Sequence, residues 1–131
     1  MRRAAKGLAA LGIEVDLILS SPYVRAQATA EIVTKVLPAR HKIQLTDHLT
    51  PDGDAAALIR QVARTAKKRV LLVGHEPYLS NLIGRLIGGG VGLSLKLRKG
   101  SVCKLAAERL KFARCAELEF LLTSGQLARI R

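Results

Sequence analysis

Apolar residues follow a helical period in several segments of the chain and form short continuous or alternating runs between them. The expected helices cover residues 2–11, 22–37, 57–66, 78–87 and 124–130. The expected strands cover residues 15–19, 42–45, 70–73, 93–97, 102–107 and 117–122. We expect the strand at 70–73 to be central and covered on both faces, because it is a continuous aliphatic run. This order predicts an α/β fold: a three-layer, mostly parallel sheet flanked by helices.

Several residues predict where these elements begin and end. Gly12 follows the first helix and suits a helix terminator. Ser21 stands before Pro22 and is the expected cap of the second helix, which Pro38 prevents from continuing. Residues 51–54 read Pro-Asp-Gly-Asp, a turn and cap pattern that predicts the start of the third helix.

Length and composition predict a single globular domain over residues 1–131, since 49% of the residues are hydrophobic and nothing suggests a second core. No apolar run approaches the roughly 18 residues that span a bilayer, so we expect a cytoplasmic protein without a transmembrane helix. Cys103 and Cys115 have neither disulfide nor metal-ligand spacing. We therefore expect no metal site.

The net charge of +12 and the isoelectric point near 10.6 indicate an anionic partner. The basic residues are scattered along the chain, over residues 2–6, 60–69, 96–99 and 109–114. The chain has only four aromatic residues on which nucleic-acid bases could stack, Tyr23, Tyr78, Phe112 and Phe120. A basic field that attracts anionic substrates is the simpler interpretation. Nucleic-acid binding is the last of the three functions that we consider for this chain.

Two loops leave the carboxyl ends of apolar strands, at residues 20–25 and 74–77. Those ends share one edge of a parallel sheet, so Arg25 and His75 can converge on one ligand near two helix amino ends. Arg25 in the first helical turn is unfavourable for the helix dipole, and a bound phosphate would explain it. An arginine fork and a histidinium can both hold phosphoryl oxygens. Taken singly, His75 could be a structural or capping residue and Arg25 a solvated surface residue.

The motifs at residues 20–31 (Ser-Ser-Pro-Tyr-Val-Arg-Ala-Gln-Ala-Thr-Ala-Glu) and 73–77 (Val-Gly-His-Glu-Pro) resemble the histidine phosphatase superfamily, which has a phosphoglycerate-mutase-like fold. The resemblance covers nearly the whole chain and is strongest to phosphohistidine phosphatases of the SixA type. It implies hydrolysis of a phosphoryl group, from a protein histidine such as that of a phosphotransfer domain or from a small phosphate ester, through a phosphohistidine intermediate. It implies no metal or cofactor.

The same resemblance implies roles for individual residues. Arg25 would be a phosphate-binding arginine, and His75 the second, non-nucleophilic histidine. Ser21 and Glu76 are further candidates for the phosphate site. Glu76 would orient His75 or handle a proton.

The chain departs from the family at the nucleophile. The superfamily has a first strand that ends in Arg-His-Gly or Arg-His-Ala, and no such motif opens this chain. Arg40-His41 is followed by Lys42 and does not end an apolar strand, so we reject it as the nucleophile. We expect an N-terminally truncated domain that lacks a central strand, either because the true start lies upstream or because the gene is a decayed copy. The alternative function is a non-catalytic phosphate- or phosphoprotein-binding remnant.

Overall fold

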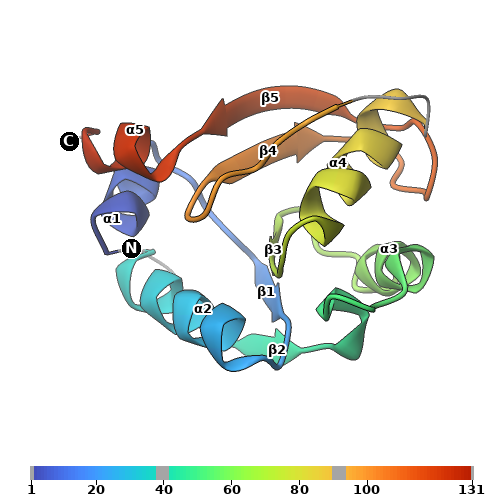
Figure 1. Cartoon of the computed structure of the whole chain (residues 1–131), viewed down its shortest axis with the longest axis horizontal. Helices are drawn as coiled ribbons and strands as arrows, with labels where there is room; N and C mark the ends of the chain where they lie inside the picture. The colour runs from blue at the N-terminus through green and yellow to red at the C-terminus, as the bar shows by residue number, and fades with distance from the viewer. Residues whose placement is uncertain (1, 38–41, 90–93, 131) are drawn as a thin grey trace.

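A computed structural model describes residues 2–37, 42–89 and 94–130 of the chain (Figure 1). The order of its elements is helix, strand, helix, strand, a 3-10 turn, helix, strand, helix, two strands and a final helix. The expected elements at residues 2–11, 22–37, 42–45, 102–107 and 117–122 are all present with small shifts of their ends.

Three parallel strands form the centre of the fold: β1 (Leu17–Ser20), β2 (Ile43–Leu45) and β3 (Val70–Val73), in the order β2-β1-β3. Ile18 and Leu19 of β1 are both fully buried, and they belong to different hydrophobic clusters. Successive side chains of a strand point to opposite faces of the sheet. The sheet is therefore covered on both faces at β1, which confirms the predicted α/β fold.

Helices pack against both faces of the parallel sheet (Figure 1). One face carries α1 (Arg2–Ala10), α2 (Val24–Val36) and α5 (Ser124–Ala128). The other carries the 3-10 turn η1 (Asp47–Leu49), α3 (Ala55–Arg64) and α4 (Tyr78–Gly88). An antiparallel hairpin of β4 (Val102–Ala106) and β5 (Glu117–Leu122) contributes side chains to both clusters.

Helix ends follow the sequence signals in most places. Gly12 and Gly89 both have positive φ, at 77° and 71°, where glycine has no steric penalty, and each follows a helix. The Asp54 carboxylate accepts a hydrogen bond from the Ala57 N–H and caps α3. Gly7 allows close packing of α1 on α5, since a Cβ there would lie 1.8 Å from the Leu127 carbonyl oxygen.

The prediction that Ser21 caps the second helix is wrong. α2 begins at Val24, and its cap residue Tyr23 makes no side-chain capping bond. The Ser21 hydroxyl instead accepts a hydrogen bond from the Tyr23 N–H at 3.2 Å. Ser21 stands two residues before the cap position of α2, so its hydroxyl closes the loop before the helix instead of bonding to an N–H of α2.

Two strand predictions also need correction. Within the described residues β3 is an edge strand, because β1 takes the central position and pairs on both sides. Val70, Leu71 and Leu72 are accordingly only half-buried. The predicted strand at 93–97 is not formed over residues 94–97, because no neighbouring strand pairs with them, and Leu93 lies outside the described residues.

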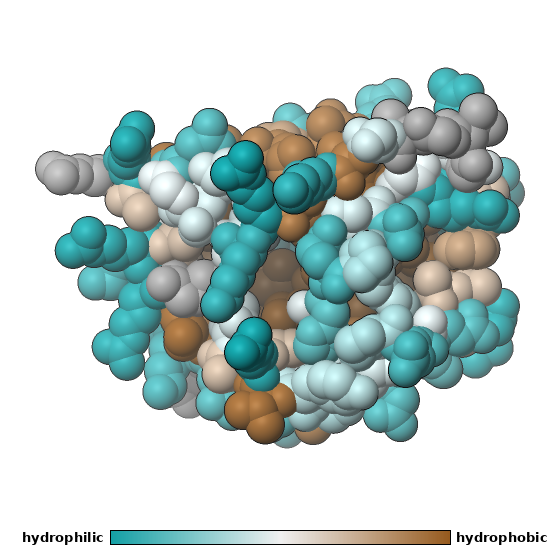
Figure 2. All heavy atoms as spheres, viewed as in Figure 1, coloured by the Kyte–Doolittle hydropathy of each residue, from teal (hydrophilic) through white to brown (hydrophobic). Residues whose placement is uncertain are grey.

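Figure 2 shows a hollow near the middle of the viewed face, with hydrophobic residues at its bottom and hydrophilic residues around its rim. β3 has no strand partner on its outer side within the described residues. Strand edges present unpaired N–H and C=O groups, so this edge of β3 is open to a further strand.

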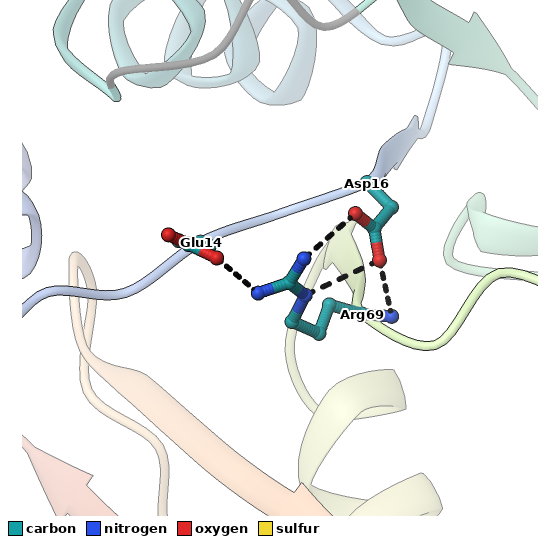
Figure 3. Close-up of polar contacts among 3 residues, drawn as sticks. All are labelled: Glu14, Asp16 and Arg69. Carbon is teal, nitrogen blue, oxygen red and sulfur yellow. Dashed lines mark hydrogen bonds and ion pairs between the residues drawn. The ribbon is translucent and has the colours of Figure 1, made fainter.

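Arg69 ties the entry of β1 to the entry of β3 (Figure 3). Its guanidinium donates to the Asp16 carboxylate at 3.1 and 3.3 Å and forms an ion pair with Glu14, while its backbone N–H also donates to Asp16. Hydrogen bonding from the Arg69 side chain lowers the pKa of Asp16. The two strands are thus joined by charge at the ends opposite to the candidate site.

We expect Arg69→Ala to raise the pKa of Asp16 toward 3.8, its ordinary value. Part of the lowering should remain, because the backbone N–H of residue 69 still donates. In the unmodified protein the pKa of Asp16 is lower in the folded than in the unfolded state. The contribution of the Asp16–Arg69 interaction to the free energy of unfolding is therefore present above about pH 4 and is lost as the pH falls further. Carboxyl-carbon NMR titration measures the change. Lys68→Ala is the matched control, and an unchanged Asp16 pKa in Arg69→Ala would contradict the assignment.

Candidate functional site

The candidate site lies where β1 and β3 end side by side. Ser20 is in register with Val73, and the Ser21 N–H donates to the Val73 carbonyl oxygen at 2.9 Å. Ligand sites of open parallel sheets lie beyond such carboxyl ends. The loops that begin with Ser21 and Gly74 are therefore held against each other, as the sequence predicts.

Ser21 and His75 are in direct contact at this edge. The Ser21 Oγ lies 2.8 Å from His75 Nε2, and Ser21 is completely buried whereas His75 is half-buried. Because the Ser21 oxygen already accepts the Tyr23 N–H, its own proton is free to point at a neutral Nε2. A second lone pair can accept Nε2–H from an imidazolium. Ser21 fixes the ring, and Nδ1–H is left to donate to a ligand when Ser21 donates to Nε2 or when the ring is an imidazolium.

Tyr23 packs on the same imidazole and was missed by the sequence analysis. Its ring meets the His75 ring edge-on, with centroids 5.2 Å apart and planes at 60°. Tyr23 is 50% exposed, so it forms an outer wall of the site. Its place two residues after Ser21 was the available signal, but the sequence does not show that the loop turns the ring toward His75.

Arg25 lies in the first turn of α2 with its side chain exposed. In the described part of the chain, no ion pair or side-chain hydrogen bond engages its guanidinium, and none joins it to Ser21 or His75. The first turn of α2 also lacks an acidic residue and a side-chain cap. An unpaired cation and unsatisfied helix N–H groups thus occur together at this end of α2.

Among the described hydrogen bonds, none joins Glu76 to His75, and the expected proton-handling role of Glu76 stays a prediction. Its carboxylate accepts the Ser80 N–H at 2.9 Å and pairs with the Ser80 hydroxyl, so it caps α4. The Ser80 Oγ in turn accepts the Leu97 N–H at 3.1 Å. Glu76 therefore caps α4, where the helix N–H groups stabilise its carboxylate. Through Ser80 it is also linked to the segment at 94–98.

Tyr78 fixes the neighbouring loop from the other side. Its hydroxyl donates to the His48 carbonyl oxygen, which joins α4 to η1. Burial, with a smaller effect from the Asp54 charge, raises the pKa of Tyr78 to about 12. The phenol therefore keeps its proton, and with it this hydrogen bond, throughout the physiological pH range.

Comparison with known proteins finds similar proteins both by sequence and by structure. No family model matches the chain. An uncharacterized protein of Picosynechococcus is 34% identical over 125 residues, which are 92% of this chain and 74% of that protein. Phosphohistidine phosphatase SixA of Escherichia coli is 29% identical over 91 residues, 67% of this chain and 56% of SixA. The protein histidine phosphatase SixA complexed with tungstate superimposes with a TM-score of 0.79 at 21% identity, covering 96% of this chain and 80% of that structure.

The chain belongs to the histidine phosphatase superfamily. Its resemblance by both sequence and structure is to the SixA phosphohistidine phosphatases, as the motifs at 20–31 and 73–77 predict. The aligned region spans about half the length of the curated SixA proteins, at 56% and 48%.

Among the described residues, His75 follows β3 and lies at the shared edge of β1 and β3. His48 lies in η1 beyond β2, and the rejected pair Arg40-His41 lies outside the described residues. Over residues 2–37, 42–89 and 94–130, no cluster of three or more His, Cys, Asp or Glu side chains could hold a metal ion. Within the same ranges, no helix combines the length and apolar character needed to cross a membrane.

Ser80→Ala should loosen the segment at 94–98, because it removes the acceptor of the Leu97 N–H and a partner of Glu76. Ser80 is buried, so we expect the free energy of unfolding to fall by about 1–3 kcal/mol and the Leu97 amide to exchange faster with solvent. Hydrogen-exchange NMR and chemical denaturation measure both effects. Ser94→Ala, at an exposed serine of the same segment, is the control, and equal Leu97 protection in both variants would refute this assignment.

Proposed function

We propose that this chain is the phosphoryl-binding part of a phosphohistidine phosphatase. The observation that carries this proposal is the 2.8 Å contact of Ser21 with His75 at the joined ends of β1 and β3. In this contact a buried hydroxyl holds the imidazole through Nε2, so that Nδ1 is left for a ligand. Arg25, which has no described side-chain partner, supplies the second donor at the same edge.

The electrostatics of this edge favour a phosphoryl group. The Arg25 guanidinium can grip two oxygens, and the first N–H groups of α2 have no side-chain cap to satisfy them. Of the two helix amino ends expected at the edge, α4 is occupied by the Glu76 carboxylate. The phosphoryl group would therefore bind between the amino end of α2 and His75. The tungstate in the related SixA structure is a tetrahedral oxyanion of this kind.

In the reaction proposed, a histidine nitrogen attacks phosphorus and displaces the phosphorylated group of the substrate, which takes up a proton as it leaves. Water then cleaves the new N–P bond and releases inorganic phosphate, restoring the histidine. Arg25 and His75 hold the phosphoryl oxygens, whose negative charge they stabilise in both transition states. The substrate is a phosphorylated protein histidine or a small phosphate ester.

The attacking histidine is not among these 131 residues. A strand that ends in this histidine would fit along the outer edge of β3, which has no strand partner in the described part of the chain. Its carboxyl end would then lie at the same edge as His75 if it ran parallel to β3. The half-buried Val70, Leu71 and Leu72 support this position, because a further strand would complete their burial.

Arg25→Ala should weaken the binding of inorganic phosphate and tungstate about ten- to hundredfold, because it removes charge-assisted hydrogen bonds. The affinity is measured by following the ring resonances of His75 during an NMR titration. Arg109→Ala is the matched control, since Arg109 is exposed near the hairpin turn and its loss lowers the net charge equally. If both variants bind as the unmodified chain does, the proposed phosphoryl site is wrong.

The 131-residue chain should show no multiple turnover of a phosphohistidine peptide or an aryl phosphate, because it lacks the attacking histidine. Release of inorganic phosphate over many enzyme equivalents measures this. Turnover that falls in His75→Ala would overturn the prediction, because a contaminant's activity would not respond to this substitution. Phosphate binding without turnover is also what the alternative, a non-catalytic phosphoprotein-binding module, predicts for this chain.

A further inference from the structure

A second basic pocket adjoins the candidate site on the α3 side. It has a volume of about 440 Å³ and is lined by side chains of η1 and α3 and by the residue before η1: Thr46, His48, Ala57, Arg60, Gln61 and Arg64. None of these described lining residues is acidic. Ser21, Arg25 and His75 do not line the pocket. The Thr46 N–H nevertheless donates to the Ser20 carbonyl oxygen at 2.9 Å, so the pocket begins one residue away from Ser21.

The frame of this pocket is fixed by hydrogen bonds. Thr46 is buried, and its hydroxyl accepts the His48 N–H at 3.3 Å and donates to Gln61 Oε1 at 2.9 Å. Tyr78 holds the His48 carbonyl from behind. Since the Gln61 oxygen is engaged, its NH₂ group is left to donate. The pocket is therefore preformed and offers donors to a ligand.

Two arginines complete the set of donors. Arg60 and Arg64 stand four residues apart on α3, where like charges repel each other. Both are exposed, and neither belongs to an ion pair in the part of the chain that the structure describes. The two guanidinium groups, the Gln61 NH₂ and an imidazole N–H of His48 can surround one anion. Such an anion would remove the repulsion between the two arginines.

We infer that this pocket is a second oxyanion site, separate from the phosphoryl site, for a phosphate or a carboxylate group. The arginine pair can hold either group in a bidentate manner. A free or esterified phosphate and an acidic protein segment are the two sources of that chemistry. The Thr46–Ser20 backbone hydrogen bond joins this pocket to the strand end that carries the candidate site.

The experiment is an NMR titration of the full chain with two probes, inorganic phosphate and a short glutamate-rich peptide. The amides of Thr46, His48 and residues 60–64 should shift with at least one probe. The double variant Arg60→Gln with Arg64→Gln should weaken that binding at least about tenfold. Shifts with phosphate identify a phosphate source, and shifts with the peptide alone identify an acidic protein segment.

The control is Arg109→Gln with Lys111→Gln, which removes the same charge from exposed positions between β4 and β5. An absence of shifts with both probes, or equal weakening by the two double variants, would overturn the second site. Arg25→Ala separates the two proposals, because it should weaken the response of His75 to phosphate about ten- to hundredfold and leave that of residues 60–64 unchanged. A loss of the His75 response in the Arg60/Arg64 variant would mean that the pocket is not separate.

Discussion

Hydrogen bonding between the parallel strands β1 and β3 is the constraint on which the candidate site depends. Their register sets Ser20 beside Val73, and the Ser21 N–H continues the pairing for one more bond, to the Val73 carbonyl. A shift of one residue would turn Ile18 and Leu19 to the wrong faces of the sheet. Burial of these two side chains therefore fixes the register, and the register brings the Ser21 hydroxyl to His75.

Side chains on the two loops then divide the functions between them. The Ser21 hydroxyl and the Tyr23 ring hold His75, whereas the Glu76 carboxylate serves α4 and the segment at 94–98 through Ser80. This division leaves one helix amino end, that of α2, free for an anion. Arg25 at this edge has no acidic partner among the residues that the structure describes, so a negatively charged ligand is favoured over neutralisation by the protein's own carboxylates.

The surface on either side of the edge differs in character. Toward α3 lies the preformed basic pocket, whose frame is stabilised by Thr46 and Tyr78. The outer edge of β3, in contrast, has no strand partner within the described residues. The first suits an anion and the second suits a strand, because unpaired backbone groups and half-buried aliphatic side chains are both completed by strand pairing.

The sequence by itself determined the α/β order of elements, the ends of most helices and the position of the loops at residues 20–25 and 74–77 at neighbouring strand ends. These features follow from local periodicity and from glycine, proline and aspartate at particular positions. Only the tertiary structure decided that Ser21 binds His75 rather than capping α2, that Glu76 bonds to Ser80, and that β3 lies at an edge. Each of these depends on which strand pairs with which and on where side chains meet across the fold, and such contacts leave no periodic trace in the sequence.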